Sequence, residues 1–450
     1  MMRSLYSGVA GLKTHQTRMD VIGNNIANVN TTAYKSQSMT FSDLMYQTTQ
    51  SASGANAATG TGGTNARQIG LGAKTSAIKT AITGQGASQT TNDPFDLMIT
   101  GENFFIVSNG SEKFFTRDGS FYVDGAGNLC MSSTGYLVQG WLADDTTGEI
   151  KQDVVKDLQI MSAKYQTYPP EATYKAEMTG IIDSNDTNVN NEGKVVTLDF
   201  YDELGYKYTA KFSITKNYDG SGDEVPGEFI MNLTEVKDAM GKVVGDTAAY
   251  ESTWAKDTVI AFDTEKGTIT SVGGDANVKE ISLKTSALGI ASMTGDVSVD
   301  FSTMVNYNNN GASTVTCTRG DSTGLGSGRK IGEMSGISIQ KDGKIYATYD
   351  NGQSRLLAQI ATAAFSNPSG LAKAGDNLYT STQNSGEFNG VGVDITAGGG
   401  YMNSGVLEMS NVDLSAEFTE MITTQRGFQA NSRIITVSDT LLEELTNLKR

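Results

Sequence analysis

The chain has 450 residues, enough for two or three domains. It carries 34 basic and 50 acidic side chains, and the net charge of −16 argues against a nucleic-acid partner and against an anionic membrane surface. The excess of acidic side chains is concentrated in the middle of the chain, since residues 151–335 hold 17 basic against 27 acidic side chains, a net of −10. The first residues contain no continuous apolar run, so we expect no membrane insertion, and any export must use a signal that is not cleaved.

Few residues are suited to catalysis or metal binding. His15 is the only histidine, and we expect it to be a solvated or interface residue. Cys130 and Cys317 lack the close spacing of a zinc site or a disulfide framework. The run GDSTGLGSGRK at 320–330 misses the phosphate-loop spacing, and Ile331 stands where Ser or Thr would bind magnesium. We therefore predict no enzyme, no cofactor and no metal.

Apolar residues recur every seven positions at the N-terminus, which predicts a helix with a narrow seam that packs against another helix. Asn24, Asn25 and Asn28 follow, and asparagine tolerates the left-handed conformation at a helix end.

The C-terminus mirrors this pattern from Leu407 onward. Asn411 and Asp413 predict the helix start, and Gly427 inside the helix should cost about 1 kcal/mol relative to alanine. Two helices packed on a globular core are the alternative to helices that pair with each other or with other copies. The predicted polymerisation seam comprises Leu5, Leu12, Met19, Ile26, Leu414, Phe418, Met421, Phe428, Ile435 and Leu442.

The segments between the helices predict a nested architecture. Residues 51–72 are small and polar and are expected to form a flexible linker. Asn-Gly and Asp-Gly turns between apolar runs predict one discontinuous β domain from residues 73–150 and 335–399. Residues 151–334 would form an inserted outer β domain, or two. The predicted fold is mainly β with α-helical terminal arms, 1–50 and 400–450, which form a coiled-coil-like inner domain.

Long stretches at both ends carry a family resemblance. The N-terminal SLYSGVAGLKTHQTRMDVIGNNIANVNTTAYKSQSMTFSDL and the C-terminal LEMSNVDLSAEFTEMITTQRGFQANSRIITVSDTLLEEL resemble the flagellar rod and hook family. FFTRDGSFYVDGAGNLCMSSTGYLVQGW at 114–141 and AFSNPSGLAKAGDNLYTSTQNSG at 364–386 are similar to its shared β domain. The resemblance covers roughly the first 150 and the last 115 residues and does not extend to the insert.

The resemblance implies a structural subunit that assembles with copies of itself into a helical tube, with the terminal helices innermost. The long insert favours the hook, a flexible torque-transmitting joint between rod and filament, over a distal rod subunit. The other alternative is a filament-scaffold protein whose insert carries a binding module or a carboxylate glycosidase. Implied partners are rod and hook–filament junction proteins, a hook cap and the flagellar export apparatus, with an extracellular location in the flagellum. The helical arms are expected to be disordered in the free subunit and to order on assembly.

Overall fold

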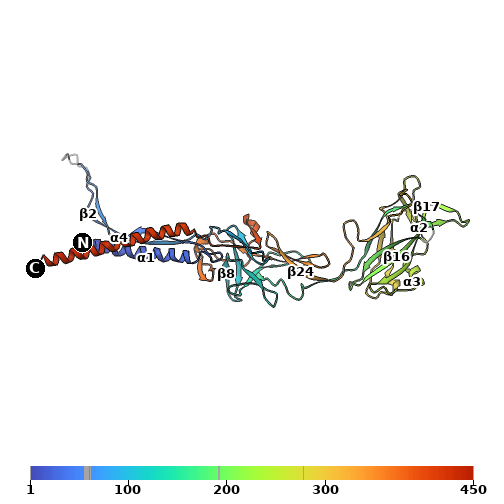
Figure 1. The fold of residues 1–450 in the computed structure, drawn as a ribbon, viewed down its shortest axis with the longest axis horizontal. Coiled ribbons are helices and arrows are strands. Elements are labelled where there is room, and N and C mark those ends of the chain that lie inside the picture. The colour runs from blue at the N-terminus through green and yellow to red at the C-terminus, as the bar shows by residue number, and fades with distance from the viewer. Residues whose placement is uncertain (1, 55–59, 61, 191–192, 277, 449–450) are drawn as a thin grey trace. The chain divides into compact units, whose positions relative to one another are not determined.

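The computed structural model describes residues 2–54, 60, 62–190, 193–276 and 278–448 (Figure 1). The chain divides into two compact units. Unit one comprises Met1–Ser162, Ile337–Ala347 and Arg355–Arg450, and unit two comprises Ala163–Gly336 and Thr348–Ser354. The predicted fold class is confirmed, because most elements are strands and helices at the two chain ends pack against each other.

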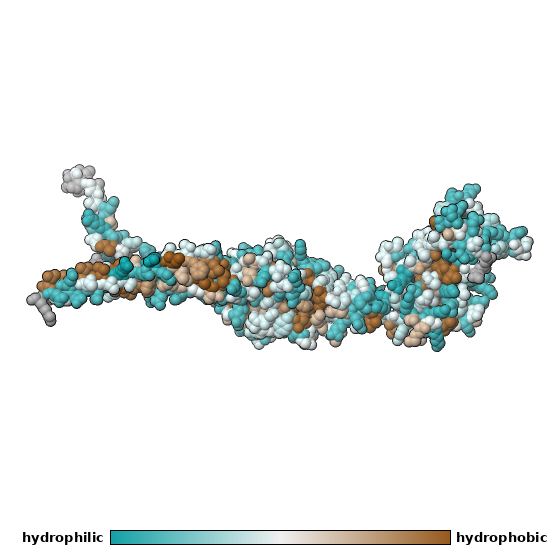
Figure 2. Space-filling view, in the orientation of Figure 1, coloured by the Kyte–Doolittle hydropathy of each residue, from teal (hydrophilic) through white to brown (hydrophobic). Residues whose placement is uncertain are grey.

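Two long helices belong to unit one, α1 (Met2–Ala27) and α4 (Leu414–Asn447). Asp413 caps α4, since its side chain accepts hydrogen bonds from the backbone N–H groups of Ser415 and Ala416. The predicted cap is thus present, but α4 starts after it, and Leu407 lies in a strand instead of continuing the helical seam. Figure 1 shows α1 and α4 side by side, and Figure 2 shows apolar residues gathered along them.

A two-stranded ribbon packs against α1. Its strands β1 (Gln37–Asp43) and β4 (Ala73–Thr80) pair antiparallel, and both contact the helix. A second antiparallel pair joins β2 (Tyr46–Gln50) to β3 (Arg67–Gly70). The prediction of a linker over 51–72 is therefore wrong at its C-terminal end, where cross-strand pairing orders residues 67–70. Residues 55–59 and 61 of that segment lie outside the described residues.

The rest of unit one is a β body built from both halves of the chain. Its main sheet includes the strand order β25-β26-β11-β7-β8-β29-β28, and its core contains Phe104, Phe115 and Trp141. Two further pairs, β6 with β30 and β5 with β31, join residues near 90–100 to residues 401–408. The strands are β5 (Ser88–Thr90), β6 (Leu97–Thr100), β7 (Phe104–Ser108), β8 (Lys113–Thr116), β9 (Phe121–Val123), β10 (Leu129–Met131), β11 (Leu137–Leu142), β12 (Lys156–Asp157), β25 (Lys344–Tyr349), β26 (Ser354–Ile360), β27 (Thr362–Ala363), β28 (Ala372–Gly375), β29 (Leu378–Thr380), β30 (Tyr401–Ser404) and β31 (Val406–Glu408).

Two expected boundaries differ from this arrangement. Residues 401–408 were expected in the C-terminal helical arm, but they form strands because β5 and β6 supply their hydrogen-bond partners. The boundary expected at residue 150 falls short of the end of unit one at Ser162. Val155, Leu158 and Ile160 are buried, and β12 pairs with β11.

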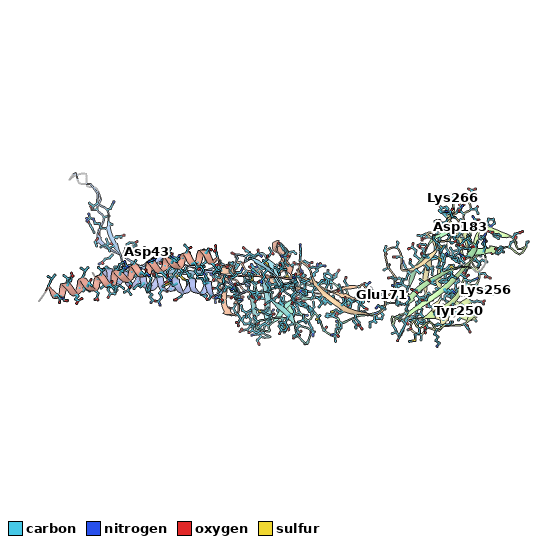
Figure 3. The ribbon with its side chains drawn as sticks, in the orientation of Figure 1. Asp43, Glu171, Asp183, Tyr250, Lys256 and Lys266 are labelled. Carbon is cyan, nitrogen blue, oxygen red and sulfur yellow. The ribbon has the colours of Figure 1, made fainter. Side chains whose placement is uncertain are left out.

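Unit two contains two five-stranded sheets around a single hydrophobic core. One has the order β15-β16-β17-β18-β19, and the other has β20-β21-β14-β22 with β23 also on β14. Trp254 and Phe212 lie in the shared core with their ring centroids 5.1 Å apart. Tyr250 on α3, labelled in Figure 3, is buried there and donates a hydrogen bond to the Val244 carbonyl at 3.0 Å. One core across both sheets favours a single domain over two.

The elements of unit two are β13 (Thr167–Tyr168), β14 (Lys175–Ile182), α2 (Thr187–Asn190), β15 (Lys194–Tyr201), β16 (Lys207–Tyr218), β17 (Glu224–Asp238), α3 (Thr247–Thr253), β18 (Thr258–Phe262), β19 (Ile269–Val272), β20 (Glu280–Leu283), β21 (Val297–Asp300), β22 (Met304–Asn306) and β23 (Thr316–Arg319). β24 (Gly332–Ile339), β25 and β26 run across the sequence boundary between the units.

Candidate assembly surface on the terminal helices

The face of α4 that packs on α1 follows a four-three spacing. Met421, Phe428, Ile435 and Leu442, all predicted seam residues, are half-buried, and Thr424 and Ser438 between them are buried. Alternation of four and three residues places both sets along one side of a helix, as in a coiled coil. The contact therefore combines an apolar column with a column of small polar residues.

Glycines on α1 let the two helices approach closely. A Cβ atom at Gly11 would lie 2.7 Å from Nδ2 of Asn431, and one at Gly8 would lie 3.4 Å from Cγ1 of Ile435. The sequence alone does not identify these glycines as contact positions, because a glycine that permits close packing looks the same in sequence as one that does not. The predicted α1 residues Leu5, Leu12, Met19 and Ile26 are half-buried, whereas Val21 and Ile22 are buried.

The middle of the helix pair is built around His15. A Cβ atom at Gly427 of α4 would lie 2.7 Å from Cε1 of His15, so the absence of a side chain there makes room for the ring. On its other side, the imidazole meets Phe41 of β1 edge-on at 5.6 Å. Arg18, one turn further on, forms an ion pair with Glu420 of α4 at 3.0 Å. These contacts pair α1 and α4 in opposite chain directions.

A second set of apolar residues on α4, here called the exposed stripe, is open to solvent in the single chain. Phe418 is 50% exposed and Val437 is 57% exposed. Leu414 and Phe418, both predicted seam residues, belong to this stripe and not to the buried contact. Its members form two groups, which at about 100° per residue lie on opposite flanks of the buried face: Leu414, Phe418 and Ile422 near the start of α4, and Ile434, Val437, Leu441, Leu445 and Leu448 toward its end. Exposed apolar groups of this size on a helix surface are typical of protein–protein contacts.

Two asparagines, the buried Asn25 and the half-buried Asn411, fix the end of α1. Asn25 is fully buried, and its Nδ2 atom donates to the Gln37 carbonyl at 2.7 Å and to Oε1 of Glu417 at 2.8 Å. Its Oδ1 atom accepts from the backbone N–H of Gln37 at 2.9 Å. Asn411 similarly accepts from the backbone N–H of Ser36 at 2.7 Å. These asparagines join α1, β1 and the start of α4, beyond the helix-ending role expected from sequence.

A buried ionic cluster joins the two chain ends to the β body. Nζ of Lys35 lies 2.7 Å from Oε1 of Glu408, and Nη1 of Arg117 lies 3.8 Å from Oε2 of the same carboxylate. All three side chains are inaccessible to solvent. Burial lowers the pKa of Lys35, against the opposing effect of Glu408, and burial raises the pKa of the nearby Tyr379 to about 12. Sequence reasoning missed this cluster, because nothing in the spacing of these residues indicates that they meet.

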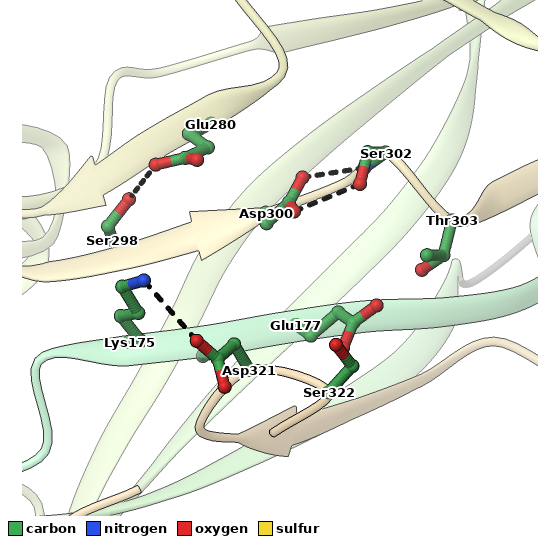
Figure 4. A pocket seen from close by; sticks show the side chains of 10 residues that line it. Lys175, Glu177, Glu280, Ser298, Asp300, Ser302, Thr303, Asp321 and Ser322 are labelled. Carbon is green, nitrogen blue, oxygen red and sulfur yellow. Dashed lines mark hydrogen bonds and ion pairs between the residues drawn. The ribbon is translucent and has the colours of Figure 1, made fainter. Parts of the chain in front are cut away.

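A hollow in unit two gathers carboxylates, as Figure 4 shows. Lys175 pairs with Asp321 at 3.4 Å, and Ser298 donates a hydrogen bond to Glu280 at 2.7 Å. Asp321 also accepts from the backbone N–H of Thr323 at 2.9 Å, which makes the 320–330 segment a hydrogen-bonded turn. Within the described ranges, no group of three His, Cys, Asp or Glu residues has metal-binding geometry.

None of the helices in the described residues is long and apolar enough to cross a membrane.

Three sequence families match separate parts of the chain. They are the flagella basal body rod protein family at residues 5–35, the flagellar hook protein FlgE/F/G D1 domain at 98–197, and the flagellar basal body rod FlgEFG protein C-terminal family at 403–448. The first and last include the α1 and α4 faces described above, and their residues Lys35 and Glu408 form the buried ion pair.

Full-length relatives match the whole chain. It is 36% identical to the flagellar hook protein FlgE of Borreliella burgdorferi and 34% identical to that of Treponema pallidum, with complete coverage of each protein. The flagellar basal-body rod protein FlgG of Bacillus subtilis is 29% identical, also over the full length. The crystal structure of Helicobacter pylori flagellar hook protein FlgE2 covers 70% of this chain and 99% of its own, at 13% identity and a TM-score of 0.42. With hook proteins above 30% identity along its whole length, the chain belongs to the flagellar hook protein family and is a structural subunit of the flagellar hook.

Proposed function

We propose that this subunit polymerises through the exposed apolar stripe of α4, which packs against the helix pair of a neighbouring copy. The observation that supports the proposal is that one face of α4 is used within the chain, while the apolar residues that flank this face are left open to solvent. A contact of this kind between different surfaces of identical subunits continues without closing and produces a helical filament. The predicted seam then has two parts, one intramolecular and one intermolecular.

The proposal assigns each predicted seam residue to one of two contacts, one within the subunit and one between subunits. Met421, Phe428, Ile435 and Leu442 hold α4 on α1, together with the predicted α1 residues Leu5, Leu12, Met19 and Ile26. Leu414 and Phe418 face a second copy, as do Val437 and the other members of the exposed stripe. The helix pairs would line the inside of a tube, and the hook would transmit torque between rod and filament.

The finer functional expectations are part of this proposal. We infer that the subunit leaves the cell through the flagellar export apparatus without a cleaved signal and adds beneath a hook cap. It would contact rod proteins at one end of the hook and hook–filament junction proteins at the other. We also infer that it has no catalytic activity, and the hydrogen-bonded carboxylates of unit two support this view.

Substitution of a stripe residue tests the proposal. Val437→Asp places a charge on the exposed stripe, where it costs little in the free subunit but would be buried between copies. We expect a folded, soluble protein that no longer forms tubes in electron micrographs after salt-induced polymerisation. Ser221→Asp adds the same charge to an exposed turn in unit two and should still give tubes. Normal tubes from Val437→Asp would overturn the assignment of the stripe.

The second candidate is a distal rod subunit, favoured by the full-length similarity to a rod protein. Tube geometry separates the two, because a rod protein forms a straight assembly and a hook protein a curved one. Curved tubes from the purified chain would decide for the hook.

A further inference from the structure

The single histidine of the chain occupies a half-buried position in the helix pair. His15 lies on α1, between Gly427 of α4 and Phe41 of β1. Its ring plane is nearly perpendicular to that of Phe41, at 89°. The imidazole therefore fills the space that the missing side chain of Gly427 leaves, and three elements meet on it.

This position suits a neutral imidazole and opposes a charged one. Nδ1 of His15 is buried and has no hydrogen-bond partner among the described residues. The guanidinium of Arg18 lies 5.4 Å from the centre of the same Phe41 ring. Burial, and then the positive charge of Arg18, lower the pKa of His15 from its ordinary value of 6.5.

Charges on the surrounding elements offer little compensation for an imidazolium. Glu420 is the carboxylate of α4 nearest to Arg18 in the contacts above, and it is already bonded to that guanidinium at 3.0 Å. Glu417, further along α4, accepts a hydrogen bond from Asn25.

The remaining charged groups on these elements include both cations and carboxylates. Arg426 adjoins Gly427 on α4, and Lys74 and Lys79 lie on β4. Asp43 ends β1 and is labelled in Figure 3. Within the described residues, no ion pair joins His15 to any of these groups.

We propose that protonation of His15 loosens the packing of α1 against α4 and β1, so that the helix pair of this subunit is an acid-sensitive joint. The direction of the pH effect follows from the linkage between protonation of His15 and folding. A histidine held neutral in the folded state contributes stability that is complete above its unfolded pKa of 6.5 and is lost as the pH falls from that value through the lower folded pKa. Opening of the helix pair is a property of the single chain, whereas weakening of a polymer in acid rests additionally on the proposed function.

Hydrogen exchange of the full-length subunit, read by mass spectrometry at about pH 7.5 and about pH 5.5, tests the proposal on either side of the ordinary histidine range. After correction for the intrinsic effect of pH on exchange, we expect peptides around His15 and Gly427 to lose protection several-fold in acid. The His15→Gln variant should keep the same protection at both values. Fluorescence of Trp141 and Trp254, buried in the two β cores, should not change.

A relocated histidine provides the matched control. The double variant His15→Gln/Gln16→His moves the imidazole to an adjacent exposed position and keeps the composition. It should behave like His15→Gln. Equal loss of protection in the native protein and in His15→Gln would overturn the proposal, as would an NMR titration that places the pKa of His15 at or above 6.5. These readouts use the unpolymerised chain, so they can fail or succeed independently of the Val437 test.

Discussion

Nζ of Lys35 lies 2.7 Å from Oε1 of Glu408, and neither side chain is accessible to solvent. Lys35 follows α1 and Glu408 precedes α4, so one buried contact joins two positions that are 373 residues apart in sequence. The carboxylate also accepts from the backbone N–H of Gly86 at 2.9 Å, and Lys35 donates to the Gly84 carbonyl at 2.7 Å. The helix pair is thereby fixed to the β body at a single ionic centre.

Removal of one partner from this centre should be costly. Lys35→Met leaves the Glu408 carboxylate buried with only the more distant Arg117, and an uncompensated buried charge typically costs about 3–5 kcal/mol. We expect the free energy of unfolding of unit one, followed by Trp141 fluorescence in a Trp254→Phe background, to fall by an amount near the lower end of that range. Lys330→Met, at an exposed pair with Asp350 in unit two, should change nothing measurable. A Lys35→Met protein as stable as the native chain would contradict the assigned role.

Two glycines of α1 should respond in opposite ways to alanine. A Cβ atom at Gly23 would have no other atom within 4 Å, so Gly23→Ala should stabilise the helix by up to about 1 kcal/mol. Gly11→Ala places Cβ 2.7 Å from Nδ2 of Asn431 and should reduce helical stability despite the better propensity. Thermal unfolding followed by circular dichroism measures both. Asn431→Ala should rescue Gly11→Ala, and a stabilising Gly11→Ala on its own would show that the close contact is absent.

The two helices should depend on each other for order. Each buries its apolar face on the other, and isolated helices are marginal in water because packing supplies most of their stability. Deletion of residues 414–450 should therefore remove more helical circular dichroism than the 34 residues of α4 account for, because the 26 residues of α1 lose their partner. Loss of the α4 share alone would mean that α1 is held by β1 and β4.

This test also refines the expectation that both arms are disordered in the free subunit. The described chain pairs α1 with α4 without a second copy, which differs from that expectation. Rapid hydrogen exchange across both helices in the monomer would favour disorder before assembly, and slow exchange in both would favour the pair.

The turn around Asp321 makes a specific pH prediction. A hydrogen bond from the Thr323 side chain, with further bonds from the backbone N–H groups of Thr323 and Leu325, lowers the pKa of Asp321 to about 2. The stabilisation is therefore present above the unfolded value of 3.8 and is lost as the pH falls through the folded value of about 2. NMR titration of Thr323→Val should show a higher pKa for Asp321. The pKa of Asp144, about 2 because of Lys151, should stay the same in that variant.

Unit two should fold on its own. Its two sheets share one core, and residues 163–336 supply nearly all of it in a single stretch. A fragment with these bounds should unfold cooperatively with a buried-tryptophan signal from Trp254. A fragment that starts at 151 instead should gain little, because Val155, Leu158 and Ile160 are buried in unit one. A molten fragment would show that unit two also requires Thr348–Ser354 or strands of unit one.

Periodic features, caps and turns in the sequence predicted the architecture well, whereas features that depend on what lies opposite a side chain were not predicted. The seven-residue spacing located both helices, and the Asp413 cap and the Asp-Gly turns fixed local structure correctly. The division of the seam into buried and exposed residues could not be predicted from the sequence. Phe418 and Phe428 look equally apolar there and differ only in what lies opposite them. The same holds for Gly427, which was expected to weaken α4 and in the structure accommodates His15.

The pairing of β5 with β31 and of β6 with β30 implies an order in which the two units can fold. Within the described residues, β5 and β6 form strand ladders only with residues 401–408, so this part of unit one cannot close before those residues are available. Unit two has local partners and needs no such delay. A chain interrupted before residue 401 would display unpaired strand edges, which are templates for aggregation. This part of the body can therefore close only when the chain up to residue 408, just before the helix α4 that begins at Leu414, is present.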